Sequence, residues 1–165
     1  MNNPPLISGE WRHAYEHMLA FFDSLNVEGE CGLIFRRDVG LGDLFLFMIS
    51  SAGETLNLSV TSWKKQYDAY RWRTETAFAP TLITETLTLP DEITNFASFF
   101  DALVLESEEK LLLKKGVVIL DGEQFRLSLF RNGERVRLLS WDSATDAIGL
   151  MKRIIDLSAG KDFNS

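Results

Sequence analysis

The sequence has little of what builds disulfides, metal centres or membrane spans. It contains one cysteine and two histidines in 165 residues. A single cysteine cannot form an intramolecular disulfide, which suits a reducing compartment. No stretch approaches the run of apolar residues that a membrane span requires, and residues 1–17 lack the basic start, apolar run and cleavage site of a secretory signal. We therefore expect a cytoplasmic protein.

The composition is that of an ordinary folded domain. Hydrophobic residues make up 45% of the chain and charged residues 25%, which is typical of globular proteins. A chain of this length can bury roughly two-thirds of the surface that it exposes when unfolded. There is no internal repeat and no linker-like segment, so we expect residues 1–165 to form a single domain.

The charge is acidic and unevenly distributed. A formal net charge of −7 disfavours a general binder of nucleic acid or of anionic membranes, since both require basic surfaces. Residues 81–109 contain seven carboxylates and no lysine or arginine, whereas residues 110–165 contain ten basic and seven acidic residues. This asymmetry indicates either a solvated face or a docking surface for a basic partner.

The first half of the chain predicts a helix followed by strands. Apolar residues recur at helical spacing from Trp11 to Leu25, which predicts an amphipathic helix. Short apolar runs at 31–37 and 43–50 flank "DVGLG", which indicates a hairpin. Alternating residues in "ETLNLSVTS" (54–62) and "YDAYRWRTET" (67–76) predict two further strands, and "TLITETLTL" (81–89) predicts another.

The second half predicts a helix, a meander and a last helix. Apolar residues from Ile93 to Val104 keep helical spacing, and the end of this helix falls between 106 and 115. The runs 116–120, 124–130 and 135–141 are joined by Asp121-Gly122 and Asn132-Gly133, which favour tight hairpin turns. Ser143 and Asp146 resemble a capping box that begins the last helix. We expect the core to include Leu127, Leu138 and Ile154.

These elements together predict an α+β fold. Hairpin connections dominate, and strands and helices do not alternate regularly. We expect an antiparallel sheet of hairpins and a meander, packed with the N-terminal, central and C-terminal helices.

Several motifs resemble catalytic or metal-binding signatures but do not fit them. His13, Glu16 and His17 match the H-x-x-E-H pattern of inverted zinc peptidases, yet both histidines lie on the polar side of the first predicted helix. "DVGLGD" lacks the spacing of a dinucleotide loop, and Cys31 has no basic neighbour that would lower its pKa. We expect Cys31 to be a small buried residue, and we assign no catalytic, cofactor-binding or metal-binding residue.

The stretch "SWKKQYDAYRWR" (62–73) is the best signal for nucleic-acid binding. It interleaves four basic and four aromatic residues between 63 and 73, a mixture that can stack bases and neutralise phosphates. Against this, strand alternation would place the aromatic residues from Tyr70 onward on the face opposite the arginines. Nucleic-acid binding therefore remains an alternative, as does a small enzyme whose site the sequence does not reveal.

The C-terminal third resembles a known class of proteins. A small acidic α+β chain ending in "DGEQFRLSLFRNGERVRLLSWDS" and a final helix is similar to the cytoplasmic immunity proteins of bacterial toxin systems. The resemblance implies an inhibitor that binds and occludes a toxin rather than a catalyst. It supplies no motif from which a functional residue can be carried over.

The acidic region provides the candidate binding residues. Toxins that act on nucleic acid are commonly basic, and complementary charge speeds encounter and selects partners. We expect the partner to be a basic toxin domain encoded nearby, and an aromatic residue to anchor the interface. The candidate contact residues are Glu92, Asp101, Glu106, Glu108 and Glu109, with Trp63 or Trp72 as the anchor.

Overall fold

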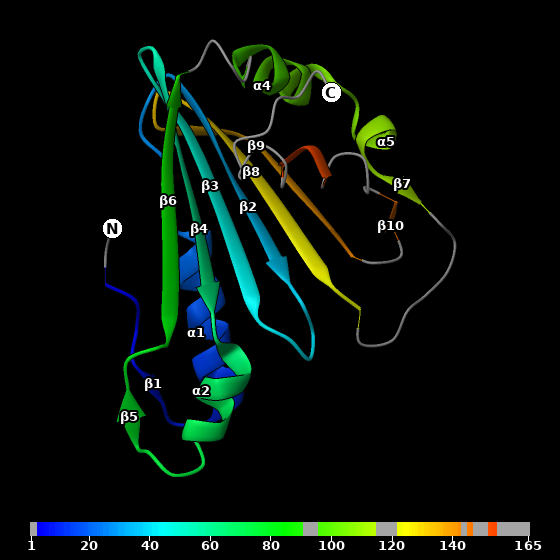
Figure 1. Cartoon of the computed structure of the whole chain (residues 1–165). Coiled ribbons are helices and arrows are strands. Elements are labelled where there is room, and N and C mark those ends of the chain that lie inside the picture. The colour runs from blue at the N-terminus through cyan, green and yellow to red at the C-terminus, as the bar shows by residue number, and fades with distance from the viewer. Residues whose placement is uncertain (1–2, 91–95, 115–121, 143–144, 147–151, 155–165) are drawn as a thin grey trace.

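The computed structural model confirms an α+β fold around one antiparallel sheet (Figure 1). It describes residues 3–90, 96–114, 122–142, 145–146 and 152–154. The sheet has six strands in the order β6-β4-β3-β2-β8-β9. These strands are β2 (Cys31–Asp38), β3 (Leu44–Ala52), β4 (Thr55–Trp63), β6 (Leu82–Pro90), β8 (Gln124–Arg131) and β9 (Glu134–Asp142).

The other elements surround this sheet. The helices are α1 (Trp11–Asp23), α2 (Lys65–Arg71), α4 (Phe96–Leu105) and α5 (Glu108–Leu111). Two short antiparallel pairs complete the structure: β1 (Ile7–Ser8) with β5 (Ala77–Phe78), and β7 (Leu113–Lys114) with β10 (Thr145–Asp146). Within the described ranges, no helix is long and apolar enough to cross a membrane.

The sheet is apolar on both faces, and each face carries a helix. Leu33 and Phe35 of β2 enter one hydrophobic cluster, while Ile34 between them enters the other, because successive strand residues point to opposite faces. The first cluster includes the buried side of α4, so we call this the α4 face. The second includes the buried side of α1, and we call it the α1 face.

The helices follow the expected apolar spacing. Ala14, Met18 and Phe22 form the buried side of α1, and His13 and His17 are exposed, as the sequence predicted. Phe96, Phe99, Phe100 and Leu103 form the buried side of α4. Ile154 is also buried in the α4-face cluster, within the helical residues 152–154. Helices from the first, central and last parts of the chain therefore contribute to the fold.

The hairpin between β8 and β9 has the predicted turn. Asn132 and Gly133 have φ values of +50° and +79°, the left-handed conformation that Asn-Gly supplies at low cost. Phe125, Leu127 and Leu129 face the α4-face cluster, as their alternation predicted. The sequence predicted a meander in which β8 lies between a strand at 116–120 and β9. In the structure β8 lies between β2 and β9 instead. Residues 116–120 lie outside the described residues.

The strand predicted at 67–76 is wrong, because residues 65–71 form α2. The inward side of this short helix carries Lys65 and Asp68, which are buried, whereas Tyr67 and Tyr70 are exposed. A surface helix usually buries its apolar residues and exposes its charged ones, and α2 shows the reverse. The alternation of aromatic and basic residues that suggested a strand therefore reflects solvent exposure, not sheet geometry.

Two further predictions near the C-terminus are corrected. Thr145 and Asp146 form β10, so Asp146 does not lie in the first turn of a helix as the capping box required; Ser143 lies outside the described residues. Leu138 is 40% exposed, because it pairs with Ser128 on the α1 face of the edge strand β9. Its neighbour Leu139 points into the core instead.

The core assignment can be tested with a pair of leucines on adjacent strands. Leu127→Ala should lower the free energy of unfolding by about 2–5 kcal/mol, because it opens a cavity under α4. Leu138→Ala should lower it by no more than about 1 kcal/mol, because the side chain is half in solvent. Urea denaturation of both variants measures the difference. Equal losses at the two positions would contradict the assignment of faces.

Candidate functional site

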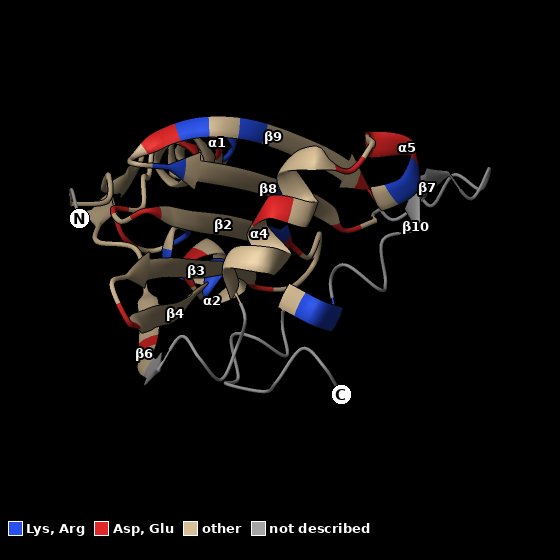
Figure 2. Cartoon of the chain, turned by 90° about the horizontal axis from the view of Figure 1, so that it is seen from above, with Lys and Arg blue, Asp and Glu red and all other residues tan. Residues whose placement is uncertain are grey.

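The acidic candidates lie along α4 and α5. Asp101 is on the exposed side of α4, and Glu108 and Glu109 form the exposed first turn of α5. Glu106 is half-buried between the two helices. Figure 2 shows acidic residues on both helices. The structure therefore brings these four carboxylates to one region, which we call the α4–α5 surface; Glu92 lies outside the described residues.

Two of these carboxylates already have basic partners. Arg131 Nη2 donates to Asp101 Oδ1 at 2.9 Å, and Lys110 Nζ lies 3.6 Å from Glu106 Oε1. Both pairs are largely exposed to solvent, where such pairs contribute little to stability. Glu108 and Glu109 are the exposed carboxylates of this region for which the structure shows no such pair among the described residues. The negative potential should therefore be strongest at the start of α5.

An exposed leucine lies among these carboxylates. Leu105, the last residue of α4, is 84% exposed, the largest exposed fraction among the large hydrophobic residues described. It lies between Asp101 and Glu106 in the sequence, directly before the turn that leads to Glu108. Leu105 is not among the candidate residues predicted from the sequence, because helical spacing places it on neither a clearly apolar nor a clearly polar side of the helix.

An arginine on the edge strand holds this surface in place. Arg137 Nη1 donates to the carbonyl oxygens of Leu103 at 2.8 Å, Val104 at 3.2 Å and Glu106 at 2.5 Å. A helix leaves its last carbonyl groups without intrahelical donors, and a cation there also interacts favourably with the helix dipole. Arg137 therefore joins β9 to the end of α4 and fixes where Leu105 emerges.

The tryptophans do not anchor the α4–α5 surface. Trp63 is fully buried in the α1-face cluster, so it cannot reach a partner, and its assignment as an anchor is wrong. Trp72 is 38% exposed and its Nε1 donates to the carbonyl of Gly9 at 2.7 Å. It follows α2, which lies at the opposite end of the strands from α4 (Figure 1). The structure therefore does not bring Trp72 and the acidic residues together.

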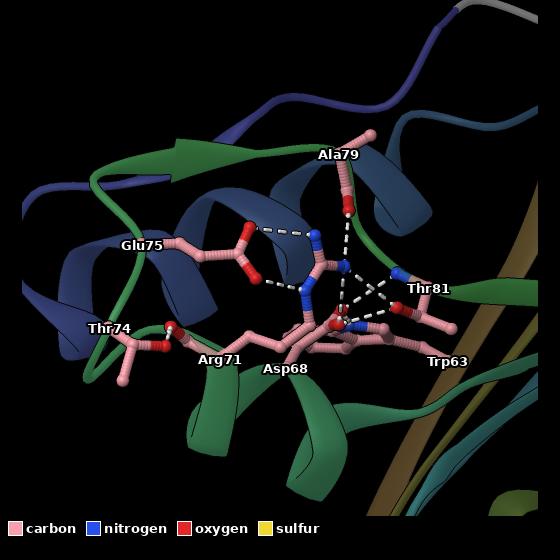
Figure 3. Close-up of polar contacts among 7 residues, drawn as sticks. All are labelled: Trp63, Asp68, Arg71, Thr74, Glu75, Ala79 and Thr81. Atoms are coloured by element: carbon pink, nitrogen blue, oxygen red, sulfur yellow. Dashed lines mark hydrogen bonds and ion pairs between the residues drawn. The ribbon is translucent and has the colours of Figure 1, made fainter.

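The stretch 63–73 is organised around one buried carboxylate (Figure 3). Asp68 is fully buried. Its carboxylate accepts hydrogen bonds from Trp63 Nε1 at 2.8 Å, from the Thr81 backbone nitrogen at 2.7 Å and from the Thr81 hydroxyl at 2.6 Å. Asp68 thus joins the end of β4, α2 and the start of β6.

Three of the four basic residues of the same stretch, Lys64, Lys65 and Arg71, are paired with carboxylates within the chain. Lys64 Nζ lies 2.8 Å from Asp43 Oδ2. Arg71 makes a two-pronged contact with Glu75, its Nε and Nη2 each 2.9 Å from a carboxylate oxygen. The hydrogen bond to Glu75 is the main cause that raises the pKa of Arg71, and the same bond lowers the pKa of Glu75. A phosphate backbone would have to displace these partners, so nucleic-acid binding loses support.

Lys65 is also committed within the chain. Its Nζ donates to Asp38 Oδ1 at 2.6 Å and to the carbonyls of Val39 at 2.9 Å and Gly40 at 3.3 Å. The Tyr15 hydroxyl donates to the other oxygen of Asp38. Burial, and then the bond to Asp38, raise the pKa of Tyr15 above its usual value. Lys65 therefore links α2 to the loop after β2, and Tyr15 links α1 to the same aspartate.

The structure has two hollows of interest on its surface. One of about 360 Å³ is lined by Trp11, Tyr15, Gly40, Leu41, Lys65, Gln66 and Ala69. The other, of about 610 Å³, lies on the α1 face beyond the helix and has a mixed lining that includes the polar residues Ser50, Asn57, Ser59, Thr86 and Thr88 and the apolar residues Val27, Met48 and Leu87. Among the described residues that line these two hollows, no hydrogen-bonded pair of a nucleophile and a base is seen.

The motifs that resembled metal or redox chemistry are now placed. His13 Nδ1 lies 3.8 Å from Glu10 Oε2 at the surface, and the described ranges hold no group of three side chains that could bind a metal ion. Cys31 is half-buried rather than buried, and it packs against the α4-face cluster.

Comparison with protein-family models, with curated proteins and with solved structures finds no match to this chain.

The role of Asp68 can be measured with a matched pair of variants. Asp68→Ala leaves one buried donor, on Trp63, and two half-buried donors, on Thr81, without their acceptor, so the free energy of unfolding should fall by roughly 3–5 kcal/mol. Glu75→Ala breaks only the exposed pair with Arg71 and should change stability much less, because water screens that pair. Urea denaturation distinguishes the two. A small loss for Asp68→Ala would contradict its role as the anchor of α2.

Proposed function

We propose that this protein is a cytoplasmic immunity protein that binds a basic bacterial toxin domain through the α4–α5 surface and neutralises it by occlusion. The observation that carries the proposal is Leu105, exposed at the end of α4 and surrounded in the chain by the four carboxylates. An apolar centre with a charged rim is the usual anatomy of a protein interface. Leu105 replaces the tryptophans as the proposed anchor.

The charges and the leucine have different roles in the proposal. Glu108 and Glu109 attract a basic partner over distance and raise the association rate. Burying Leu105 contributes affinity, since removing a leucine side chain from water is worth about 1.5–3 kcal/mol. Because Arg137 fixes the end of α4 before binding, little conformational entropy should be lost when the partner docks.

The resemblance of the C-terminal third to immunity proteins supports the same function. It agrees with an acidic charge and with an α+β fold whose last strands form the Asn132-Gly133 hairpin. The two alternatives have weaker support. The basic residues Lys64, Lys65 and Arg71 have carboxylate partners within the chain, which leaves a nucleic-acid module few cations. A small enzyme would need a poised group that neither hollow supplies.

The charge contribution can be tested with the product of the neighbouring gene. If this product co-purifies with the chain, changing Glu106, Glu108 and Glu109 to lysine should slow association by about tenfold or more at low salt and weaken its salt dependence. The control changes Glu10, Glu16 and Glu75, which are exposed elsewhere, by the same total charge. Stopped-flow or surface-binding kinetics measure both. Equal slowing in the two variants would remove the α4–α5 surface from the interface.

The anchor can be tested separately. Leu105→Ala should raise the dissociation constant by about tenfold, mainly through faster dissociation. Leu138→Ala is the control, since it removes a partly exposed leucine from the opposite face. An unchanged dissociation constant for Leu105→Ala would show that Leu105 is not buried by the partner. Failure of the chain to bind any neighbouring product would count against the immunity function itself.

A further inference from the structure

Three arginines from three adjacent strands converge on one aspartate at the end of α1. Arg36 Nη1 of β2 lies 2.5 Å from Asp23 Oδ1, and Arg126 Nη1 of β8 lies 3.4 Å from Asp23 Oδ2. Arg135 Nη2 of β9 donates to the backbone carbonyl of Asp23 at 2.8 Å. We call Arg36, Arg126 and Arg135 the arginine cluster. It lies on the α1 face, opposite the face that carries α4.

The cluster has more positive charge than its described partners balance. Arg36 and Arg126 are directly opposite each other in the register of β2 and β8, and like charges in that position destabilise a sheet. A guanidinium group stays protonated in proteins, so the repulsion cannot be relieved by losing a proton. In the contacts that the described residues show, the three cations share the carboxylate and the backbone carbonyl of Asp23. The next carboxylate on this face of β2, Asp38, is bonded to Lys65 and Tyr15.

The donors of the cluster are also incompletely used. Arg36 is more than nine-tenths buried. The Nε atoms of Arg36 and Arg126 are buried and have no hydrogen-bond acceptor among the described residues. Buried donors without an acceptor are rare in folded proteins, and an ordered water or ion is a common explanation. Excess charge and unused donors therefore occur at the same place.

We infer that the arginine cluster binds an oxyanion, the phosphate or carboxylate group of a ligand, beside the C-terminal end of α1. Guanidinium groups bind such groups through paired, charge-assisted hydrogen bonds. The outer part of the cluster can be approached from solvent, because Arg126 keeps 28% of its side chain exposed and Arg135 is exposed on the edge strand, whereas the two Nε atoms lie beneath it. Ser140, exposed and opposite Arg126 on β9, adds a hydroxyl donor.

The binding can be measured with inorganic phosphate as the probe. At constant ionic strength, phosphate should raise the melting temperature of the protein in a saturable way, and sodium chloride should not, since a ligand that binds only the folded state stabilises it. Arg126→Gln should weaken phosphate binding about tenfold or more, the loss expected for one hydrogen-bonded charge. Arg131→Gln, which removes an exposed arginine of the same strand on the far side of the sheet, should change it less than about twofold.

A second measurement does not depend on stability. In proton–nitrogen NMR spectra, phosphate should shift the side-chain Nε resonances of the arginine cluster and leave that of Arg131 in place. Sodium acetate in the same titration distinguishes the two sources of the oxyanion: binding comparable to phosphate would indicate a carboxylate ligand, and much weaker binding a phosphate ligand. Stabilisation equal to that by chloride, or equal weakening in Arg126→Gln and Arg131→Gln, would overturn the inference.

Discussion

The structure depends on a sheet that carries apolar residues on both of its faces. In β2, Leu33 and Phe35 point to one side while Ile34 points to the other, and β3 repeats this arrangement. Such a sheet cannot leave either face in water, since burying apolar area is the dominant favourable term in folding. Helix α1 covers one face and α4 the other. The packing of α1 on one face and of α4 on the other determines where the candidate sites lie, because the exposed sides of these helices form part of the protein surface.

Buried polar side chains then determine how the connections between strands are held. Asp68 accepts three hydrogen bonds inside the protein, and Lys65 spans from α2 to the loop after β2. A buried charge is costly unless it is paired and hydrogen-bonded, so these groups tolerate few alternative geometries. These hydrogen bonds fix the conformation of connections whose apolar residues do not determine it. The same commitment removes Lys64, Lys65 and Arg71 from the cations that could contact an external anion.

The difference between the predictable and the unpredictable parts of the fold has a physical basis. The hairpin at Asn132-Gly133, the faces of Leu127 and Leu129, and the buried side of α4 follow from local turn chemistry and apolar periodicity. The helix at 65–71 could not be found in that way, because its buried positions are polar. Leu138 and Leu139 are adjacent leucines, and only the register of β9 against β8 decides which is buried.

The candidate site was predictable in charge but not in geometry. The gap in basic residues between 81 and 109 is visible in the sequence and locates the carboxylates. The exposure of Leu105 depends instead on where α4 ends, and that end is bonded to Arg137, thirty-two positions later in the chain. The burial of Trp63 depends on its packing against Tyr15 of α1. Contacts between distant segments of this kind leave no local signal.

The two proposed binding regions are consistent with one another because the sheet separates them. Glu108 and Glu109 extend the negative charge of the α4–α5 surface, whereas the arginine cluster carries excess positive charge on the α1 face. Charges on opposite faces orient an approaching molecule before contact, and the screening length of their fields is about 8 Å at physiological ionic strength. A basic partner should therefore be drawn to α4 and α5 and repelled from the arginine cluster. Net charge alone would not provide this orientation; the orientation arises because α1 and α4 cover opposite faces of the same sheet.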